Sequence, residues 1–576
     1  MTQEESAATA GANVGSAADE LVRVLADEGV RHLFFNPGTD TAPIQEALAL
    51  ARERGLPHPQ TVLCTHELVA LSAALGNYFV TGRAQALAVH VDAGTLNVGA
   101  ALHNVQRDRA PVVLIAGRSP YSVRADVPGH RDSPIHWQQE QPDQGAAMRA
   151  YGKWAMEVPR GREMSRLVRR AFQVARAAPS GLSYLMLPRE VLMEPAEEAG
   201  PPLAVPRPPA PDPEGLGELA ERLADAHEPV VLVDRVGRCP RSVEVLVQIA
   251  ELIGALVLER RDVVNFPARH PLYGGTRTPE LLAAAGAVLL LDAEVPWIPA
   301  VGGPPAGTAV LQIGIDCVKR TMPSWSYPID LALEADTRTA LPLLLAELQR
   351  IGTTGRRELW ARNRARAEAV AAEQQASWRR RASSGRAEDA PDAMLAALDE
   401  VLPAEAITIQ EAVTNQVACQ RQLRRPPGRH FDIGAPALGG GLGAAFGAKL
   451  GAPDAPVLSV VGDGSFNFGV PSAALWSAHR AGAPFVSVIL NNSTYLASLQ
   501  PVRRLFPDGA ATRQGDFPET RLGGGIDYVA LAQACGGCGD VVEHPEEMRE
   551  AMRAALAGTA RGRCSVIDVR LPAPSY

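Results

Sequence analysis

Two apolar runs near the C-terminal end of the chain each lead into polar, oxygen-bearing residues, and this pairing constrains the fold most. Residues 457–461 (VLSVV) precede Gly462-Asp463-Gly464-Ser465, and residues 485–490 (FVSVIL) precede Asn491-Asn492-Ser493-Thr494, with 25 residues between the two polar segments. Short apolar runs of this kind are typical of buried strands. Because open parallel sheets gather polar groups at the carboxyl ends of their strands, we expect both segments to meet at one edge.

The residue types in these segments suit a magnesium ion. Mg²⁺ prefers hard oxygen ligands and is commonly shared with phosphate groups. Asp463 offers a carboxylate, Asn492 a side-chain carbonyl and Thr494 a backbone carbonyl. The sequence therefore predicts a metal site made by these three residues.

The residues around Asp463 favour a phosphate next to that metal. Gly462 and Gly464 lack a Cβ, so the backbone there can approach a phosphate closely. Ser465 is predicted to begin a helix, and the N-terminus of a helix favours anions. The alternative is a strand-turn-helix with an incidental Asp-Gly turn.

Length, charge and cysteine usage narrow the class of protein. A chain of 576 residues is expected to form about three domains. Its 56 basic and 64 acidic residues give a net charge of −8, which suggests neither a nucleic-acid partner nor a membrane-surface role. No apolar run reaches the roughly 20 residues of a membrane helix. The start of the chain, residues 1–15, is unlike a signal peptide and is predicted to be a disordered leader.

The seven cysteines are scattered, as is typical of a cytoplasmic protein with reduced thiols. Cys535 and Cys538 have the spacing of a redox or zinc pair, but no second pair or nearby histidine completes such a site. We interpret them as part of a Gly-rich turn between a helix and a strand.

Two linkers divide the chain into three blocks. A Pro-rich linker is predicted at 194–211 and an Arg-rich helical linker at 351–391, which leaves blocks at 16–193, 212–350 and 392–576. Each block alternates short Val-, Leu- and Ala-rich runs with amphipathic helical stretches. This alternation predicts an α/β protein with three doubly wound parallel sheets.

The order of the blocks, with the metal motif in the last, resembles the decarboxylase and acetolactate synthase superfamily of thiamine diphosphate (ThDP) enzymes. The resemblance implies that the first block binds the aminopyrimidine of ThDP and that the last binds its diphosphate with Mg²⁺. It also implies a Rossmann-like central domain and an active site shared between subunits, hence a homodimer or homotetramer. The central block has no G-x-G-x-x-G phosphate fingerprint, so FAD is not supported.

Two residues are placed in the cofactor site by this resemblance. The segment 62–70 (VLCTHELVA) fits the family's glutamate after the second strand, so Glu67 is expected to hydrogen-bond the pyrimidine N1′. The alternative for Glu67 is a charge in the first turn of a helix. The Gly-rich segment 438–449 places Leu438 as the bulky residue beneath the cofactor. Leu442 competes for that role, and simple core packing is the other interpretation.

Two further segments resemble benzoylformate decarboxylase. The stretch 36–39 (NPGT) corresponds to a loop with a substrate-facing hydroxyl, here Thr39, and 90–95 (HVDAGT) to a segment with an active-site histidine, here His90. Histidine suits proton transfer because its pKa lies near neutrality. A satisfied structural histidine is the alternative, and Asp92 either orients His90 or caps the following turn.

The remaining pocket candidates rest on weaker likenesses. Gln139 lies in a stretch similar to the Phe-Gln-Glu segment of acetolactate synthases. Trp297 lies where benzoylformate decarboxylase has a second active-site histidine, which this chain lacks. Residues 496–525, rich in Gly, Arg and Pro, show no clear periodicity and are predicted to form a mobile cover.

The expected function is decarboxylation of a 2-oxo acid to an enamine, which is then protonated or ligated to a second carbonyl compound such as an aldehyde. Acetolactate synthase is the main alternative. A 2-hydroxyacyl lyase and a non-catalytic ThDP-binding homologue are further alternatives.

Overall fold

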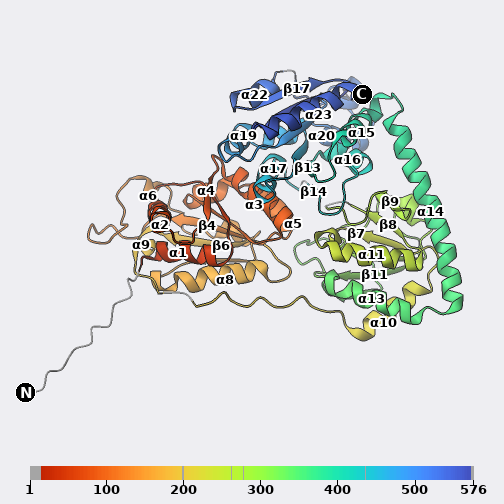
Figure 1. Cartoon of the computed structure of the whole chain (residues 1–576), viewed down its shortest axis with the longest axis horizontal. Coiled ribbons are helices and arrows are strands. Elements are labelled where there is room, and N and C mark those ends of the chain that lie inside the picture. The colour runs from red at the N-terminus through yellow and green to blue at the C-terminus, as the bar shows by residue number, and fades with distance from the viewer. Residues whose placement is uncertain are drawn as a thin grey trace, which may run out of the picture. The chain divides into compact units, whose positions relative to one another are not determined.

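A computed structural model describes residues 15–197, 200–260, 263–276, 278–434, 436–523 and 525–572 (Figure 1). Apart from Gly15, the predicted leader lies outside these residues. The chain divides into two compact units, one comprising Met1–Ala74 and Arg83–Val205 and the other Leu75–Gly82 and Pro206–Tyr576. No helix within the described part of the chain combines the length and the apolar character that a membrane span requires.

Three six-stranded sheets organise the described residues, and all of their strand pairs are parallel, which confirms the predicted fold class. The strands are continuous apolar runs because helices cover both faces of such sheets. In spatial order, the sheet of the first unit consists of β2 (Gln60–Leu63), β1 (His32–Phe35), β3 (Gln85–Val89), β4 (Val112–Arg118), β6 (Ser183–Pro188) and β5 (Trp154–Glu157).

The second unit contains the other two sheets. The central sheet consists of β12 (Leu331–Glu334), β11 (Ala309–Gly314), β10 (Ala287–Leu291), β7 (Val230–Val233), β8 (Leu256–Glu259) and β9 (Tyr273–Thr276). The last sheet consists of β14 (His430–Asp432), β13 (Ile407–Glu411), β15 (Val457–Gly462), β16 (Val486–Asn491), β18 (Ser565–Arg570) and β17 (Cys538–Val542).

The helices of the first unit begin where the sequence supplies caps and apolar stripes. Ser16 makes a capping box with Asp19 at the start of α1. Four helices share one core against the sheet: α1 (Ala17–Asp27), α2 (Ala42–Glu53), α8 (Met164–Arg176) and α9 (Arg189–Met193). The other helical segments are α3 (Glu67–Thr81), α4 (Val91–Asn97), α5 (Ala101–Arg107), α6 (Ile135–Gln138), α7 (Ala146–Arg149) and the 3-10 turn η1 (Gly161–Glu163).

The helices of the second unit follow the same logic around each sheet. Those near the central sheet are α10 (Pro213–Ala224), η2 (Val236–Arg238), α11 (Pro240–Ile253), α12 (Pro279–Leu282) and α13 (Thr337–Ile351). Those near the last sheet are η3 (Ala387–Asp389), α15 (Ala390–Val401), η4 (Val413–Asn415), α16 (Gln416–Gln422), α17 (Gly440–Gly451), α18 (Asp463–Phe468), α19 (Pro471–Arg480), α20 (Leu496–Leu505), α21 (Ala510–Gln514), α22 (Tyr528–Ala534) and α23 (Pro545–Ala560).

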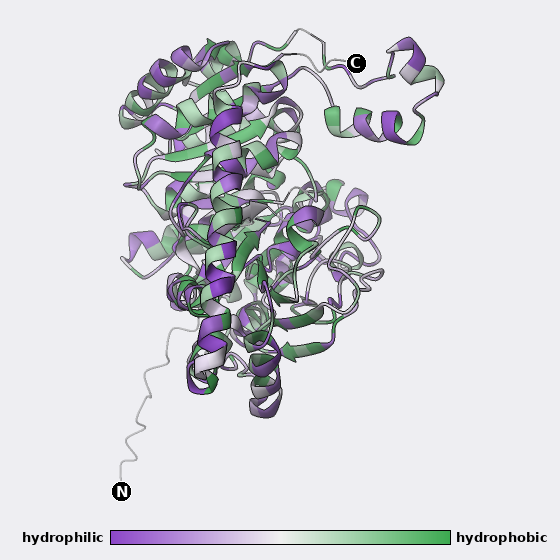
Figure 2. Ribbon diagram, turned by 90° about the vertical axis from the view of Figure 1, so that its right-hand side faces the viewer, coloured by the Kyte–Doolittle hydropathy of each residue, from purple (hydrophilic) through white to green (hydrophobic). Residues whose placement is uncertain are grey.

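The Arg-rich linker forms a 29-residue helix, α14 (Thr354–Ala382). Hydrophilic stretches alternate with paler and hydrophobic ones along this helix in Figure 2, in keeping with its mixture of arginines and alanines. One stripe is nevertheless buried in the central core, through Trp360, Ala367, Ala371 and Trp378. The sequence shows little apolar periodicity here because the stripe is made of alanines and two widely spaced tryptophans. Helix α14 therefore packs against the central core in addition to serving as a linker.

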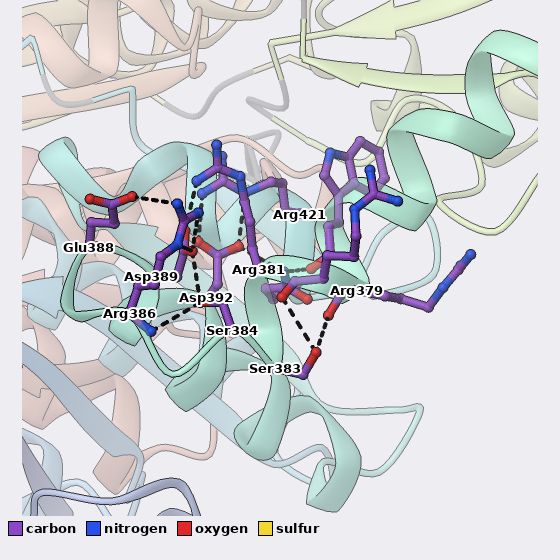
Figure 3. Close-up of polar contacts among 12 residues, drawn as sticks. Arg379, Arg381, Ser383, Ser384, Arg386, Glu388, Asp389, Asp392 and Arg421 are labelled. Carbon is purple, nitrogen blue, oxygen red and sulfur yellow. Dashed lines mark hydrogen bonds and ion pairs between the residues drawn. The ribbon is translucent and has the colours of Figure 1, made fainter.

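A cluster of arginines and aspartates fastens the end of α14 to α15 and α16 (Figure 3). Buried Asp389 accepts hydrogen bonds from Arg381 and Arg386 at 2.7 Å each. Asp392 receives a two-pronged contact from Arg421 at 2.8 and 2.6 Å. Paired guanidinium and carboxylate groups of this geometry are among the stronger polar contacts in proteins.

Three local expectations can be compared with the structure. Helix α18 begins at Asp463, two residues earlier than the predicted start at Ser465, because the backbone turns directly after β15. The segment 496–525, predicted to form a mobile cover and without clear periodicity, contains α20 and α21. The apolar signal was weak because Leu499 is the only residue of α20 that is buried. Cys535 and Cys538 flank the predicted turn between a helix and a strand, α22 and β17.

Candidate functional site

Glu67 is the buried centre of a polar cluster in the first unit. It opens α3, four residues after the end of β2, and only 5% of its surface is exposed. Its Oε1 accepts a hydrogen bond from Asn36 Nδ2 at 2.5 Å, and its Oε2 accepts one from Asn97 Nδ2 at 2.6 Å. Asn36 directly follows β1 and Asn97 ends α4. Two amides from separate elements thus fix the orientation of one carboxylate.

His90 lies beside this carboxylate and makes two hydrogen bonds of its own. It follows the last residue of β3, as predicted, and precedes α4. Its Nδ1 makes a short contact with Asp40 Oδ1, and its Nε2 lies 3.0 Å from Gln139 Oε1. The hydrogen bond with Asp40 raises the pKa of His90, burial opposes this, and the Glu67 carboxylate adds a smaller raising effect.

The structure does not support the interpretation that Asp92 orients His90. Asp40 contacts the His90 ring, whereas Asp92 lies in the first turn of α4 and its buried Oδ1 accepts no hydrogen bond from any described residue. Of the predicted pocket residues, Gln139 is joined to His90. Thr39 is exposed in the loop after β1, and its carbonyl accepts a hydrogen bond from Arg189 at 3.4 Å.

Asp463 is the buried centre of a second polar cluster, at the carboxyl ends of β15 and β16. It is 4% exposed, and its Oδ1 accepts the backbone N–H of Gly464 at 2.8 Å. Its buried Oδ2 has no hydrogen-bond partner among the described residues. Burial raises the pKa of Asp463, while the backbone N–H groups of Gly464, Ser493 and Thr494 lower it. A buried carboxylate oxygen without a partner fits a cation.

The other two predicted metal ligands lie in the loop after β16. Pairing of Gly462 with Leu490 brings the ends of β15 and β16 side by side, as expected. Asn492 Oδ1 accepts the N–H of Thr494 at 3.0 Å, and the carbonyl of Thr494 accepts the N–H of Leu496 at 2.8 Å. An amide oxygen has two lone pairs, so the Asn492 oxygen can accept this N–H and also bind a metal.

Neighbouring side chains fix the shape of this loop. Asn491 donates to Asp568 Oδ1 at 2.8 Å, and Asn491 Oδ1 accepts the N–H of Ser493 at 3.0 Å. Ser493 adopts a left-handed backbone with φ of 53°. The β18 residue Asp568 therefore acts through Asn491 on the turn that carries the predicted ligands.

The two glycines around Asp463 have different surroundings. A Cβ at Gly462 would meet no atom within 4 Å, so open space faces the backbone where a phosphate is predicted. A Cβ at Gly464 would lie 2.8 Å from the ring of Tyr495, so this glycine also allows close packing. Ser465 is buried in α18, next to the same loop. The open space at Gly462 and the free Asp463 oxygen both fit a metal-bound phosphate.

The Gly-rich start of α17 surrounds a second buried carboxylate. Glu411, at the end of β13 and 1% exposed, accepts the N–H groups of Gly439, Gly440 and Gly441 at 2.8, 3.2 and 2.8 Å. Burial raises the pKa of Glu411 to about 7, and the three N–H groups oppose the shift. Sequence reasoning did not identify this residue, because its partners are backbone groups.

The competitors for the bulky cofactor contact are separated by their burial. Leu442 is fully buried within α17, where it packs next to Gly469, whereas Leu438 precedes the helix and is half-buried. Leu442 thus serves the core, and Leu438 stays the predicted contact. Trp297 belongs to the central core at 9% exposure, edge-on to Tyr327 with 5.3 Å between ring centroids. Its place in a substrate pocket stays a prediction.

Several site residues emerge only from the structure. Asp40, Asn36 and Asn97 contact the predicted catalytic residues, and Asp568 supports the metal loop. A polar residue directly after a strand was the available signal for Asn36, whereas Asp40, five residues after the end of β1, had no such signal. Nothing in the local sequence of Asp568 pointed to Asn491, because the two are joined only by the pairing of β16 with β18.

Comparison with known proteins agrees with this arrangement. Residues 16–147 match the thiamine pyrophosphate enzyme N-terminal TPP binding domain, and residues 412–569 match the C-terminal TPP binding domain. Benzoylformate decarboxylase of Pseudomonas aeruginosa is 28% identical over 94% of this chain and 96% of that protein. Sulfoacetaldehyde acetyltransferase of Rhodobacter capsulatus is 26% identical over 96% of this chain and 93% of that protein.

A solved structure supports the fold over the whole chain. The ThDP-dependent 4-hydroxybenzoylformate decarboxylase of Rhodococcus jostii RHA1 superposes with a TM-score of 0.78 at 24% identity, covering 98% of this chain and all of that one. The likeness concerns the fold alone. With both cofactor-binding domains matched and three parallel sheets present, the chain belongs to the thiamine diphosphate-dependent enzymes.

Proposed function

We propose that this protein is a ThDP- and Mg²⁺-dependent enzyme that decarboxylates a small 2-oxo acid and releases the aldehyde. The observation that carries the proposal is the Glu67 cluster. A buried carboxylate, fixed by two amides, lies in one unit with a histidine that can deliver protons. The relative named benzoylformate decarboxylase supports the same reaction class.

When bound, ThDP supplies an electron sink for the electrons that remain after CO₂ leaves. Glu67 is assigned to hold a proton at the pyrimidine nitrogen of the cofactor. Asp463, Asn492 and the Thr494 carbonyl are assigned to Mg²⁺, and the backbone at Gly462 and Gly464 to the phosphate beside it. Leu438 is assigned to an apolar contact with the cofactor.

His90 is assigned to proton transfer at the substrate. A raised pKa keeps a larger share of its imidazole protonated near neutral pH, which suits a proton donor. Protonation of the reacting carbon gives an aldehyde, whereas ligation places the proton on the carbonyl oxygen of the acceptor. We assign His90 to the first of these proton transfers, which gives aldehyde release.

Assembly and location complete the proposal. We expect a homodimer or homotetramer, because the family resemblance implies that two subunits share each active site. All seven cysteines are free thiols, in keeping with a cytoplasmic protein. Sedimentation of the purified protein measures the assembly directly, and a monomer that is fully active would contradict this part of the proposal.

A panel of 2-oxo acids, supplied with ThDP and Mg²⁺ and with or without aldehyde acceptors, tests the reaction. CO₂ with an equal amount of aldehyde is expected. Acetolactate formed from pyruvate would instead establish the acetolactate synthase alternative, and transfer of an acetyl group to an acceptor would agree with the named acetyltransferase relative. No CO₂ from any donor would refute the proposal.

Glu67→Gln separates catalysis from binding. We expect it to lower the rate of CO₂ release by about 100-fold or more, since general acid–base groups typically contribute that much. Mg²⁺-dependent ThDP binding should stay within about threefold, because Glu67 contributes a proton contact and not the phosphate anchor. Glu53→Gln, at the exposed end of α2, is the matched control and should leave both unchanged. Turnover of Glu67→Gln at the wild-type rate would exclude the assigned role.

A further inference from the structure

The His90 ring has an acceptor at each nitrogen. Nδ1 contacts a carboxylate oxygen of Asp40, and Nε2 lies 3.0 Å from the amide oxygen of Gln139. A neutral imidazole carries only one N–H, so it can donate to one of these oxygens but not to both. With the oxygen of the Gln139 amide turned toward the ring, as here, both contacts are satisfied at once when each ring nitrogen carries a proton. The geometry thus favours the imidazolium form of His90.

Asp40 is built into the fold at this position. It is 1% exposed, and its Oδ2 also accepts the backbone N–H of Val91 at 3.2 Å. The carboxylate therefore holds both the ring of His90 and the backbone of the next residue. Val91 has a φ of 32°, an unfavourable value for a β-branched residue, at the point where the chain turns from β3 into α4.

Two glycines leave the space that this arrangement needs. A Cβ at Gly117 would lie 1.5 Å from Asp40 Oδ2, and a Cβ at Gly38 would lie 2.1 Å from His90 Nδ1. Neither position could carry a side chain without displacing the pair. The contact between Asp40 and His90 therefore depends on a glycine in the loop after β1 and on another near the end of β4.

The charged groups that face this pair are few. Asp40 and Glu67 both favour a positive charge on His90, from the loop after β1 and from the start of α3. Gln139 is neutral and extends from the end of α6. His136, also on α6, faces Asp40, and burial lowers its pKa, so it adds no competing positive charge near neutral pH. The surroundings of His90 are therefore net negative.

We propose that Asp40 is the positioning residue that keeps a proton on both nitrogens of His90, with Gln139 fixing the direction of its Nε2–H. The inference rests on the proposed function for its catalytic meaning. In the reaction, the Nε2 proton passes to the substrate carbon that lost CO₂. Neutral His90 keeps its Nδ1–H on Asp40, and Nε2 then takes a proton from water. One proton is consumed for each CO₂ and aldehyde released.

A spectroscopic test addresses the pair without any substrate. In protein labelled with ¹⁵N-histidine, the ring signals of His90 are assigned by their absence in His90→Gln and followed against pH. We expect both nitrogens to be protonated at pH 7 in the wild type. In Asp40→Asn, which keeps the shape and removes the charge, the pKa of His90 should fall by about 1–3, as expected for the loss of a nearby opposite charge. Asp92→Asn is the matched control, two residues from His90, and should leave that pKa unchanged.

Kinetics provide the second readout. The basic limb of the kcat profile should move to lower pH in Asp40→Asn by the same amount as the pKa of His90, while Asp92→Asn keeps the wild-type profile. A His90 that is neutral at pH 7 in the wild type, or a pKa unaffected in a folded Asp40→Asn, would overturn the inference even if CO₂ release is observed. If no 2-oxo acid releases CO₂, the proposed function fails, and the spectra still decide whether Asp40 holds His90 charged.

Discussion

A close helix contact within the second unit, to which residues 75–81 of α3 belong, allows a sharp test of packing. A Cβ added at Gly76 of α3 would lie 1.9 Å from the backbone carbonyl oxygen of Ala444 in α17. Ordinary contacts begin at 3.4 Å, so the helices must separate by about 1.5 Å. The neighbouring hydrogen bond from Asn77 to the carbonyl of Gly447, at 3.1 Å, is then also lost.

We expect Gly76→Ala to lower the free energy of unfolding by about 1–3.5 kcal/mol. Overpacking costs about 1–3 kcal/mol and the lost hydrogen bond about 1 kcal/mol, while the higher helix propensity of alanine returns about 0.5–1 kcal/mol. Equilibrium urea unfolding measures the total. Hydrogen exchange of the backbone N–H groups in α17 shows whether the loss is local.

Gly217→Ala is the matched control for this prediction. Gly217 also lies inside a helix, α10, but a Cβ there would meet no atom within 4 Å. Alanine should therefore stabilise that variant by about 0.5–1 kcal/mol through propensity alone. If Gly76→Ala and Gly217→Ala shift the urea midpoint equally, the close approach of α3 and α17 is wrong.

Two further predictions concern buried carboxylates of the second unit. Burial raises the pKa of Glu411 from its usual 4.5 to about 7, so the folded state holds an extra proton between these two pH values. The contribution of Glu411 to the free energy of unfolding therefore falls by about 3 kcal/mol as pH rises from 4.5 to about 7. Glu411→Gln removes that component, so the difference in unfolding free energy between wild type and variant should change with pH, and a constant difference would contradict the assignment. Asp568→Ala should weaken Mg²⁺ binding, measured by titration calorimetry with ThDP present, by about 10-fold or more, because Asn491 loses the group that orients it. Asp540→Ala, on the exposed part of the adjacent strand β17, is its control, and equal affinities in the two variants would exclude the supporting role.

Strands and the elements that carry the motif residues were predictable because their signals are local. The run before Asp463 becomes β15, the run before Asn491 becomes β16, and Glu67 opens α3 as expected. Each depends on a continuous apolar segment that ends in polar residues. The same reasoning predicts that Asp463 and the Asn491 segment meet at one sheet edge, and the pairing of β15 with β16 confirms it.

The partners of the site residues were not predictable in the same way. The sequence offers Asp92, two residues from His90, as the partner of the His90 ring. The observed partner is Asp40, because the loop after β1 brings its carboxylate to the ring. Glu411 is satisfied by backbone N–H groups, which every residue except proline possesses, so no residue type marks the interaction. Helix α20 was missed because a helix with a single buried residue leaves almost no apolar period.

The two carboxylates assigned to the cofactor differ in how their oxygens are occupied, and the difference matches their roles. Both oxygens of Glu67 already accept strong hydrogen bonds from amides, so its direction is set in advance and a ligand proton must use the remaining lone pairs. Asp463 has one buried oxygen without a partner among the residues that the structure describes, which is unfavourable unless a cation binds there. The first arrangement suits a group that must act on a proton from a fixed position. The second suits a group that becomes more stable when a cation binds to it. For this reason we expect Glu67→Gln to leave ThDP binding nearly unchanged, whereas Asp568→Ala, which alters the loop beside Asp463, should weaken Mg²⁺ binding.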